Sequence, residues 1–132
     1  MYETLTRYLP ELERERDCGE LAVDTGQSPY LDYSQTVEGI MDAVYRFVEE
    51  HPEYNLYRYQ DVLEESGLAW DGRILREADA SKLDGKTVMA MIMGVIRADR
   101  FCEGALLEFC EDGYISRWLI RLKEIDDGQE DA

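Results

Sequence analysis

Positive charge, histidine, cysteine and long apolar runs are all scarce in this 132-residue sequence. The single histidine argues against a histidine-rich zinc site. The three cysteines include no C-x-x-C pair, a pattern typical of reduced thiols in the cytoplasm. The longest apolar run, residues 88–96, is far shorter than the roughly 18 residues of a membrane span. The first residues also lack the basic-then-apolar pattern of a signal peptide. We therefore expect a cytoplasmic protein without a membrane segment.

Acidic side chains are abundant instead. Thirty Asp and Glu face fourteen Lys and Arg, for a formal net charge of −16. Such a charge disfavours direct binding to nucleic acid or to anionic membranes, and it attracts basic protein surfaces through long-range steering. Residues 71–100 are nearly neutral and hold the most apolar stretch, so the acids concentrate in the flanking regions. This distribution predicts a buried centre surrounded by acidic outer elements.

The hydrophobic fraction of 45% excludes a disordered acidic chain and allows one folded domain. We find no internal repeat and no linker that would divide it. The sequence predicts a single helical domain over residues 1–125. Residues 126–132 are expected to form a disordered acidic tail.

Helical periodicity runs through most of the chain. Residues 2–16 read as a helix that Pro10 kinks or splits. Turn-rich residues follow, in which the segments 20–23 and 30–33 could pair as a small hairpin. Ser34 is the expected N-cap of an amphipathic helix that ends before His51 and Pro52. Its inner stripe comprises Val37, Ile40, Met41, Val44, Phe47 and Val48.

Five further helical segments are expected in the second half. Asn55 could cap a helix over 56–66 that stops at Gly67, and one turn is expected at 74–78. Ser81 and Asp84 resemble a capping box that opens a helix over 82–99. That helix is apolar on nearly every face and should be buried all round. A helix over about 100–111 should bury Phe101, Ala105 and Phe109, and a last helix contains residues 115–122.

One of these predictions has an open alternative, because residues 105–118 could instead form two strands around the Asp112-Gly113 turn. The expected fold is mainly α, a compact single-domain bundle of five to seven helices around the 82–99 helix, with a possible small hairpin within 20–33.

The run TVMAMIMGVIRADRFCEGALL at residues 87–107, with Asp112-Gly113, Trp118-Leu119 and RLKEID at 121–126, resembles a family of small acidic bacterial proteins. That family is a domain of unknown function. Residues 2–10 and 59–67 resemble it as well, so the likeness covers nearly the whole chain. It implies a helical domain, a cytoplasmic setting and an association with mobile elements. It brings no catalytic residue and no ligand.

No motif assigns a chemistry. Gly85-Lys86-Thr87 copies the end of a phosphate-binding loop, but the pattern needs a glycine where Ala80 stands, and a preceding strand.

His51 is explained by its place at a helix C-terminus. Cys102 and Cys110 lie too far apart along a helix to share a metal, and Cys18 lies in a more exposed, acidic stretch. Pairs of carboxylates are common, and nothing selects one pair for acid–base work. We predict no catalytic residue, no metal site and no cofactor.

The segment 49–65 is the candidate partner-binding site. Carboxylates interleaved with tyrosines suit clusters of Lys and Arg, through ion pairs and cation–π contacts. The alternative is a solvated acidic helix whose tyrosines pack inward. A DNA-reading helix-turn-helix over 56–78 is excluded because that segment has no basic face. The candidate residues are Glu49, Glu50, Glu53, Tyr54, Tyr57, Asp61, Glu64 and Glu65.

Three functions remain open from the sequence. The first is a non-enzymatic inhibitor that mimics nucleic acid and occupies a basic nucleic-acid-binding protein, of anti-restriction or anti-CRISPR type. The second is an acidic adaptor or homo-oligomer whose charge mainly keeps it in solution. The third, an enzyme or ligand sensor, would need a deep pocket with a perturbed carboxylate. We expect the protein not to be an enzyme.

Overall fold

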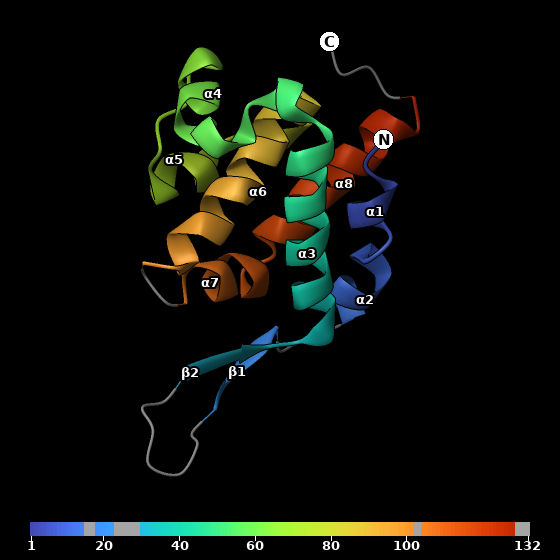
Figure 1. The fold of residues 1–132 in the computed structure, drawn as a ribbon, viewed down its shortest axis with the longest axis vertical. Coiled ribbons are helices and arrows are strands. Elements are labelled where there is room, and N and C mark those ends of the chain that lie inside the picture. Colours follow the sequence, from blue (N-terminus) through green and yellow to red (C-terminus); the bar gives the residue numbers. More distant parts are fainter. Residues whose placement is uncertain (15–17, 23–29, 102–103, 129–132) are drawn as a thin grey trace.

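The computed structural model describes residues 1–14, 18–22, 30–101 and 104–128 (Figure 1). The chain starts with α1 (Glu3–Thr6) and α2 (Leu9–Arg14), so the expected 2–16 helix is split. Pro10 lies in the first turn of α2, where a missing backbone N–H removes no helical hydrogen bond. Residues 15 and 16 of that prediction lie outside the described residues.

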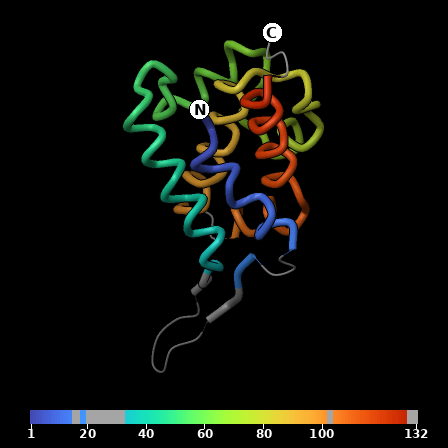
Figure 2. The backbone as a smooth tube through the Cα atoms, turned by 90° about the vertical axis from the view of Figure 1, so that its right-hand side faces the viewer, coloured from blue at the N-terminus to red at the C-terminus, as the bar shows by residue number. Residues whose placement is uncertain are grey.

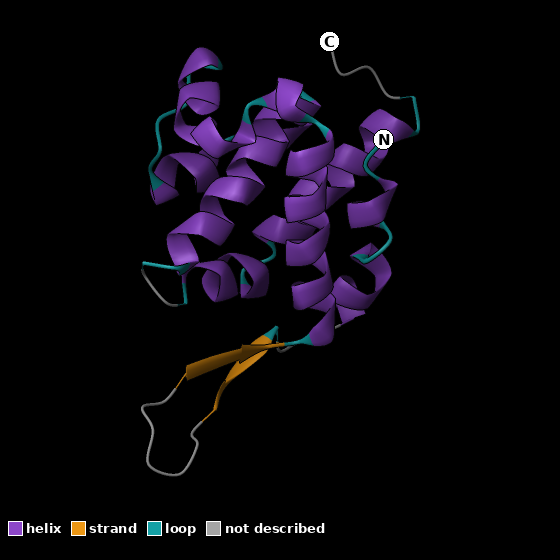
Figure 3. Cartoon of the chain, in the orientation of Figure 1, coloured by secondary structure: helices purple, strands orange, loops and turns teal. Residues whose placement is uncertain are grey.

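A small hairpin projects from the helical body (Figure 3). Strands β1 (Gly19–Ala22) and β2 (Tyr30–Tyr33) pair antiparallel, with Gly19 opposite Tyr33 and Ala22 opposite Tyr30. The predicted hairpin is confirmed, although Val23 and the turn lie outside the described residues.

Helix α3 (Gln35–Glu50) follows the predicted pattern. The Ser34 hydroxyl accepts a hydrogen bond from the Val37 amide at 3.2 Å, which confirms the predicted N-cap. The inner stripe is buried except for Met41, which is half-buried. His51 forms the C-cap, and Pro52 opens the short 3₁₀ turn η1 (Pro52–Tyr54).

The next helix starts later than expected. A 3₁₀ turn, η2 (Leu56–Arg58), precedes α4 (Tyr59–Glu65). The predicted N-cap role of Asn55 is wrong, because its side chain makes no cap and its backbone is left-handed at φ 55°. Asparagine tolerates that conformation, which here ends η1. Gly67, also left-handed, stops α4 as predicted.

The predicted capping box at Ser81 is wrong. Asp71 caps α5 (Gly72–Glu77), and Asp79 caps η3 (Ala80–Lys82), which contains Ser81. Leu83 is then extended, and Asp84 itself caps α6 (Gly85–Asp99) by accepting from the Thr87 amide at 2.9 Å. The central helix therefore begins at residue 85, not 82.

Helix α6 is the centre of the core. Every residue from Thr87 to Ile96 is buried, and α6 packs against α3, α4, η2, α7 and α8. The tube in Figure 2 shows the outer helices around it. Gly94 lies where Trp70 and Tyr59 press against α6, which explains a glycine inside this helix.

Helices α7 (Ala105–Glu111) and α8 (Tyr114–Asp126) complete the fold. The strand alternative for residues 105–118 is wrong, because both segments are helical with Gly113 left-handed between them. In the described residues, with α1 and α2 counted as one interrupted helix, there are seven α-helices. The predicted mainly-α bundle is confirmed.

The end of α6 differs from the prediction of a helix over 100–111. The Asp99 carboxylate accepts from the Gly104 and Leu106 amides and so organises the turn before α7. Phe101, predicted to be buried, is 88% exposed because it falls in this turn.

Helix α8 continues to Asp126, the residue at which the acidic tail was predicted to begin. Asp126 belongs to α8, and its carboxylate accepts from the Tyr2 amide and pairs with the Met1 amino group at 3.0 Å. Residues 129–132 lie outside the described residues.

Candidate functional site

The candidate acidic residues gather at one end of the molecule. The last turn of α3 and helix α4 both lie at the end opposite the hairpin (Figures 1 and 2). The 3₁₀ turns η1 and η2 connect them. The chain thus carries residues 49–65 across one end of the bundle instead of along one continuous helix.

Four of the predicted carboxylates are exposed and not neutralised. Glu49, Glu50, Glu64 and Glu65 are all exposed, and among the described residues none of them has a cation within ion-pair distance. Tyr57 lies on η2, between Glu49-Glu50 and Glu64-Glu65 in the sequence, and its side chain is 62% exposed. These five residues, which we call the acidic end, combine unpaired negative charge with an available aromatic ring.

The other three predicted residues have partners within the fold. Asp61 pairs with Arg58 at 2.8 Å, and Glu53 accepts a hydrogen bond from His51 at 3.0 Å. That hydrogen bond lowers the pKa of the Glu53 carboxyl below its usual value. Tyr54 is half-buried, its hydroxyl 2.7 Å from that of Tyr2. The interpretation of inward-packed tyrosines therefore holds for Tyr54 and not for Tyr57.

The segment that resembles a phosphate-binding loop has a structural role. No strand precedes it, since Leu83 and η3 come directly before α6. Thr87 is buried and its hydroxyl lies 2.6 Å from that of Ser66, so it ties α6 to the end of α4. The ring of Tyr2 lies against Gly85.

Two cysteines meet in the core. Cys18, expected to be in a more exposed stretch, is buried, and it contacts Cys110 of α7. A hydrogen bond between the two thiols, together with burial, raises the pKa of the Cys110 thiol. Neither is disulfide-bonded. Cys102 lies outside the described residues.

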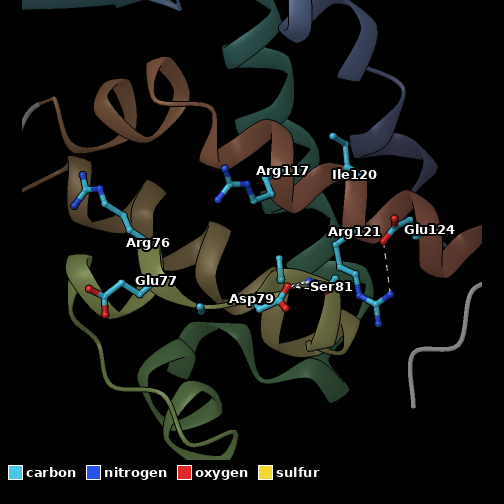
Figure 4. Close-up of a pocket in the computed structure, with 10 residues that line it drawn as sticks. Arg76, Glu77, Asp79, Ser81, Arg117, Ile120, Arg121 and Glu124 are labelled. Atoms are coloured by element: carbon cyan, nitrogen blue, oxygen red, sulfur yellow. Dashed lines mark hydrogen bonds and ion pairs between the residues drawn. The ribbon is translucent and has the colours of Figure 1, made fainter.

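Sequence reasoning missed a cavity between α5, η3 and α8. It has a volume of about 440 Å³ and is lined by three arginines, Arg76, Arg117 and Arg121, with Ile120 beside them. Figure 4 shows Arg117 between the other two arginines. The i, i+4 spacing of Arg117 and Arg121 was visible in the sequence, but Arg76 joins them only through the fold. We call this the arginine cavity.

The described ranges hold no group of three or more His, Cys, Asp or Glu placed to bind a metal ion. In the same part of the chain, no helix is both long and apolar enough to cross a membrane.

This chain belongs to a family of unknown function, DUF6508, whose model matches residues 2–128. The match agrees with the resemblance noted from the sequence. A search of curated proteins and a search of solved structures each returned no match.

Proposed function

We propose that this chain is a non-enzymatic cytoplasmic protein that binds a basic protein surface through its acidic end. The observation that carries the proposal is the set of four exposed carboxylates, Glu49, Glu50, Glu64 and Glu65, none of which has a cation within ion-pair distance in the described part of the chain. Asp61 on the same helix is paired, as are Glu77 and Asp127 farther away. Other exposed acids without an ion pair among the described residues do exist, but these four gather at one end of the bundle. Unpaired charge at one end is what a basic partner would neutralise.

The finer form of the proposal is mimicry of nucleic acid. Helix ends hold the carboxylates in place, so they can stand where phosphates would stand in the channel of a restriction enzyme, a CRISPR effector or a similar protein. The exposed ring of Tyr57 adds a surface on which a partner's Arg or Lys can stack. The resemblance to proteins of mobile elements fits an inhibitor of this kind.

A second candidate is an acidic adaptor or homo-oligomer. Phe101 favours it, because a phenylalanine that is 88% exposed on a charged surface suits an apolar contact. In that case the acids would lie at the rim of the interface or outside it.

The test is a pulldown from nuclease-treated bacterial lysate with three forms of the protein. One is the original chain. The second carries Glu49→Gln, Glu50→Gln, Glu64→Gln and Glu65→Gln. The matched control carries Glu13→Gln, Glu38→Gln, Asp42→Asn and Glu111→Gln. It removes the same charge from exposed positions elsewhere that form no ion pair with another described residue.

We expect nucleic-acid-handling proteins to be recovered by the original and control forms at low salt, lost at high salt, and lost with the first variant. Equal recovery by both variants would place binding outside the acidic end. Salt-resistant recovery of the chain itself, abolished by Phe101→Ser, would support the homo-oligomer.

A further inference from the structure

We infer that the arginine cavity binds the phosphoryl group of a small phosphomonoester. The cavity gathers three of the chain's fourteen basic residues in one concave place, although acids outnumber bases twofold. Its volume of about 440 Å³ lies in the range of small-molecule sites. This site is separate from the acidic end and does not depend on the function proposed for it.

Aromatic stacking orients two of the arginines. The Arg76 guanidinium lies over the Phe109 ring at 4.3 Å from its centroid, and that of Arg117 lies over the Tyr114 ring at 5.1 Å. A stacked guanidinium keeps its N–H donors at its edge, where they can bind oxyanion oxygens in pairs. The protein has therefore positioned these donors before any ligand arrives.

Arg76 and Arg117 keep donors for a ligand. Arg117 has no ion pair with any described carboxylate, and Arg76 has one long contact, 3.7 Å to the exposed Glu108. The third, Arg121, is buried and held by its hydrogen bond to the Leu83 carbonyl at 2.8 Å. Because Arg121 is also paired with Glu124 at 3.8 Å, Arg76 and Arg117 are the guanidiniums that can bind an anion.

Three carboxylates also line the cavity, and each has a partner. Glu77 pairs with Arg73 at 3.0 Å, and Asp79 accepts from the Ser81 amide and hydroxyl. Glu124 lies 3.8 Å from Arg121 (Figure 4). The many distant acids are screened beyond about 8 Å at physiological salt. With these carboxylates partnered, Arg76 and Arg117 are the cationic groups of the lining that remain to bind an anion.

A phosphomonoester fits this arrangement better than a single carboxylate. It carries a charge of about −1.5 to −2 and three terminal oxygens, which can engage guanidiniums from two helices at once. Ile120, which is 41% exposed, lies beside the arginines and can cover the carbon portion of the ligand.

The test is an NMR titration of the ¹⁵N-labelled protein with inorganic phosphate, glycerol 3-phosphate and glutarate at constant ionic strength. We expect saturable shifts at α5, η3 and α8 with phosphate, tighter binding of glycerol 3-phosphate, and weaker binding of the dicarboxylate glutarate. Arg117→Gln should lower phosphate affinity about tenfold or more.

The matched control is Lys123→Gln, which removes one positive charge from the same helix at a residue that lines a different pocket. It should leave phosphate affinity unchanged. The inference is overturned if phosphate produces no saturable shift, if both variants weaken binding equally, or if glutarate binds as tightly as glycerol 3-phosphate.

Discussion

Gly94 shows how one missing side chain allows the core to close. A Cβ built on Gly94 would lie 2.7 Å from Trp70 Cη2 and 2.9 Å from Tyr59 Cδ2. We expect Gly94→Ala to destabilise the fold by about 1–2 kcal/mol, since overpacking outweighs the gain in helix propensity. Urea unfolding followed by circular dichroism measures it.

Gly39→Ala is the matched control, also on a helix. Its Cβ would meet the outer end of the Tyr8 ring, which is half-buried and can rotate away. This variant should be at least as stable as the original chain. A Gly94→Ala protein of unchanged stability would mean that Trp70 moves as easily as Tyr8.

Tyr33 links stability to high pH. Burial and its hydrogen bond to Asp99 at 2.8 Å raise the pKa of the phenol above its ordinary value of 10.0. Because the phenol has a higher pKa in the folded protein than in the unfolded chain, its neutral form favours folding. This contribution to stability is fully present below pH 10 and is lost as the pH rises through the pKa of the folded state.

We therefore expect the free energy of unfolding to fall more steeply between pH 9 and pH 12 in the original chain than in Tyr33→Phe. The Cys110 thiol, whose pKa is also raised, is present in both proteins. Denaturant titrations at several pH values test this. Parallel curves for the two proteins would refute the role of Tyr33.

At the scale of elements, the start of α6 depends on one carboxylate. Asp84→Ala should cost about 1 kcal/mol, because the Thr87 amide loses its cap inside a half-buried helix end. Ser81→Ala should cost clearly less, since its hydroxyl only contacts the exposed Asp79. Thermal unfolding compares the two variants. An equal loss of stability in both would support the capping box predicted from the sequence.

Helices and their ends were predictable where a few neighbouring residues determine them. The stripe of α3, its Ser34 cap, the Gly67 stop and the apolar α6 follow from periodicity and turn chemistry. Asp84 was misread because Ser81 and Asp84 are both good caps, and only the extended backbone of Leu83 separates them. Phe101 was misread because the helix pattern continues through a turn that the distant contacts of Asp99 create.

At the scale of the whole molecule, charge opposes compaction. With a net charge of −16, mutual repulsion destabilises the folded state, and salt screens it. Raising NaCl from 10 to 300 mM should raise the melting temperature by about 3–5 °C, equivalent to roughly 1 kcal/mol. Calorimetry measures the shift. A melting temperature that falls with salt would show that surface ion pairs outweigh repulsion.

The same prediction applies to the two variants, proposed above for the pulldown, in which four carboxylates are replaced by amides. Both should flatten the salt dependence to a similar degree, because folding responds to total charge. Partner binding should distinguish them, because it depends on where the charge lies.

The sequence by itself determined the helical class, the buried central helix and the acidic character, and it allowed the hairpin without fixing it. Periodicity and capping depend on a few neighbouring residues, and the charges of the side chains simply add. Even for the acidic end, it indicated the segment 49–65 but not which carboxylates stay unpaired. Only the tertiary structure decided that Tyr54 turns inward, that Cys18 meets Cys110, and that Arg76 joins Arg117 and Arg121 around a cavity. Those pairings join residues far apart in the chain, and their geometry is set by how the helices pack around α6.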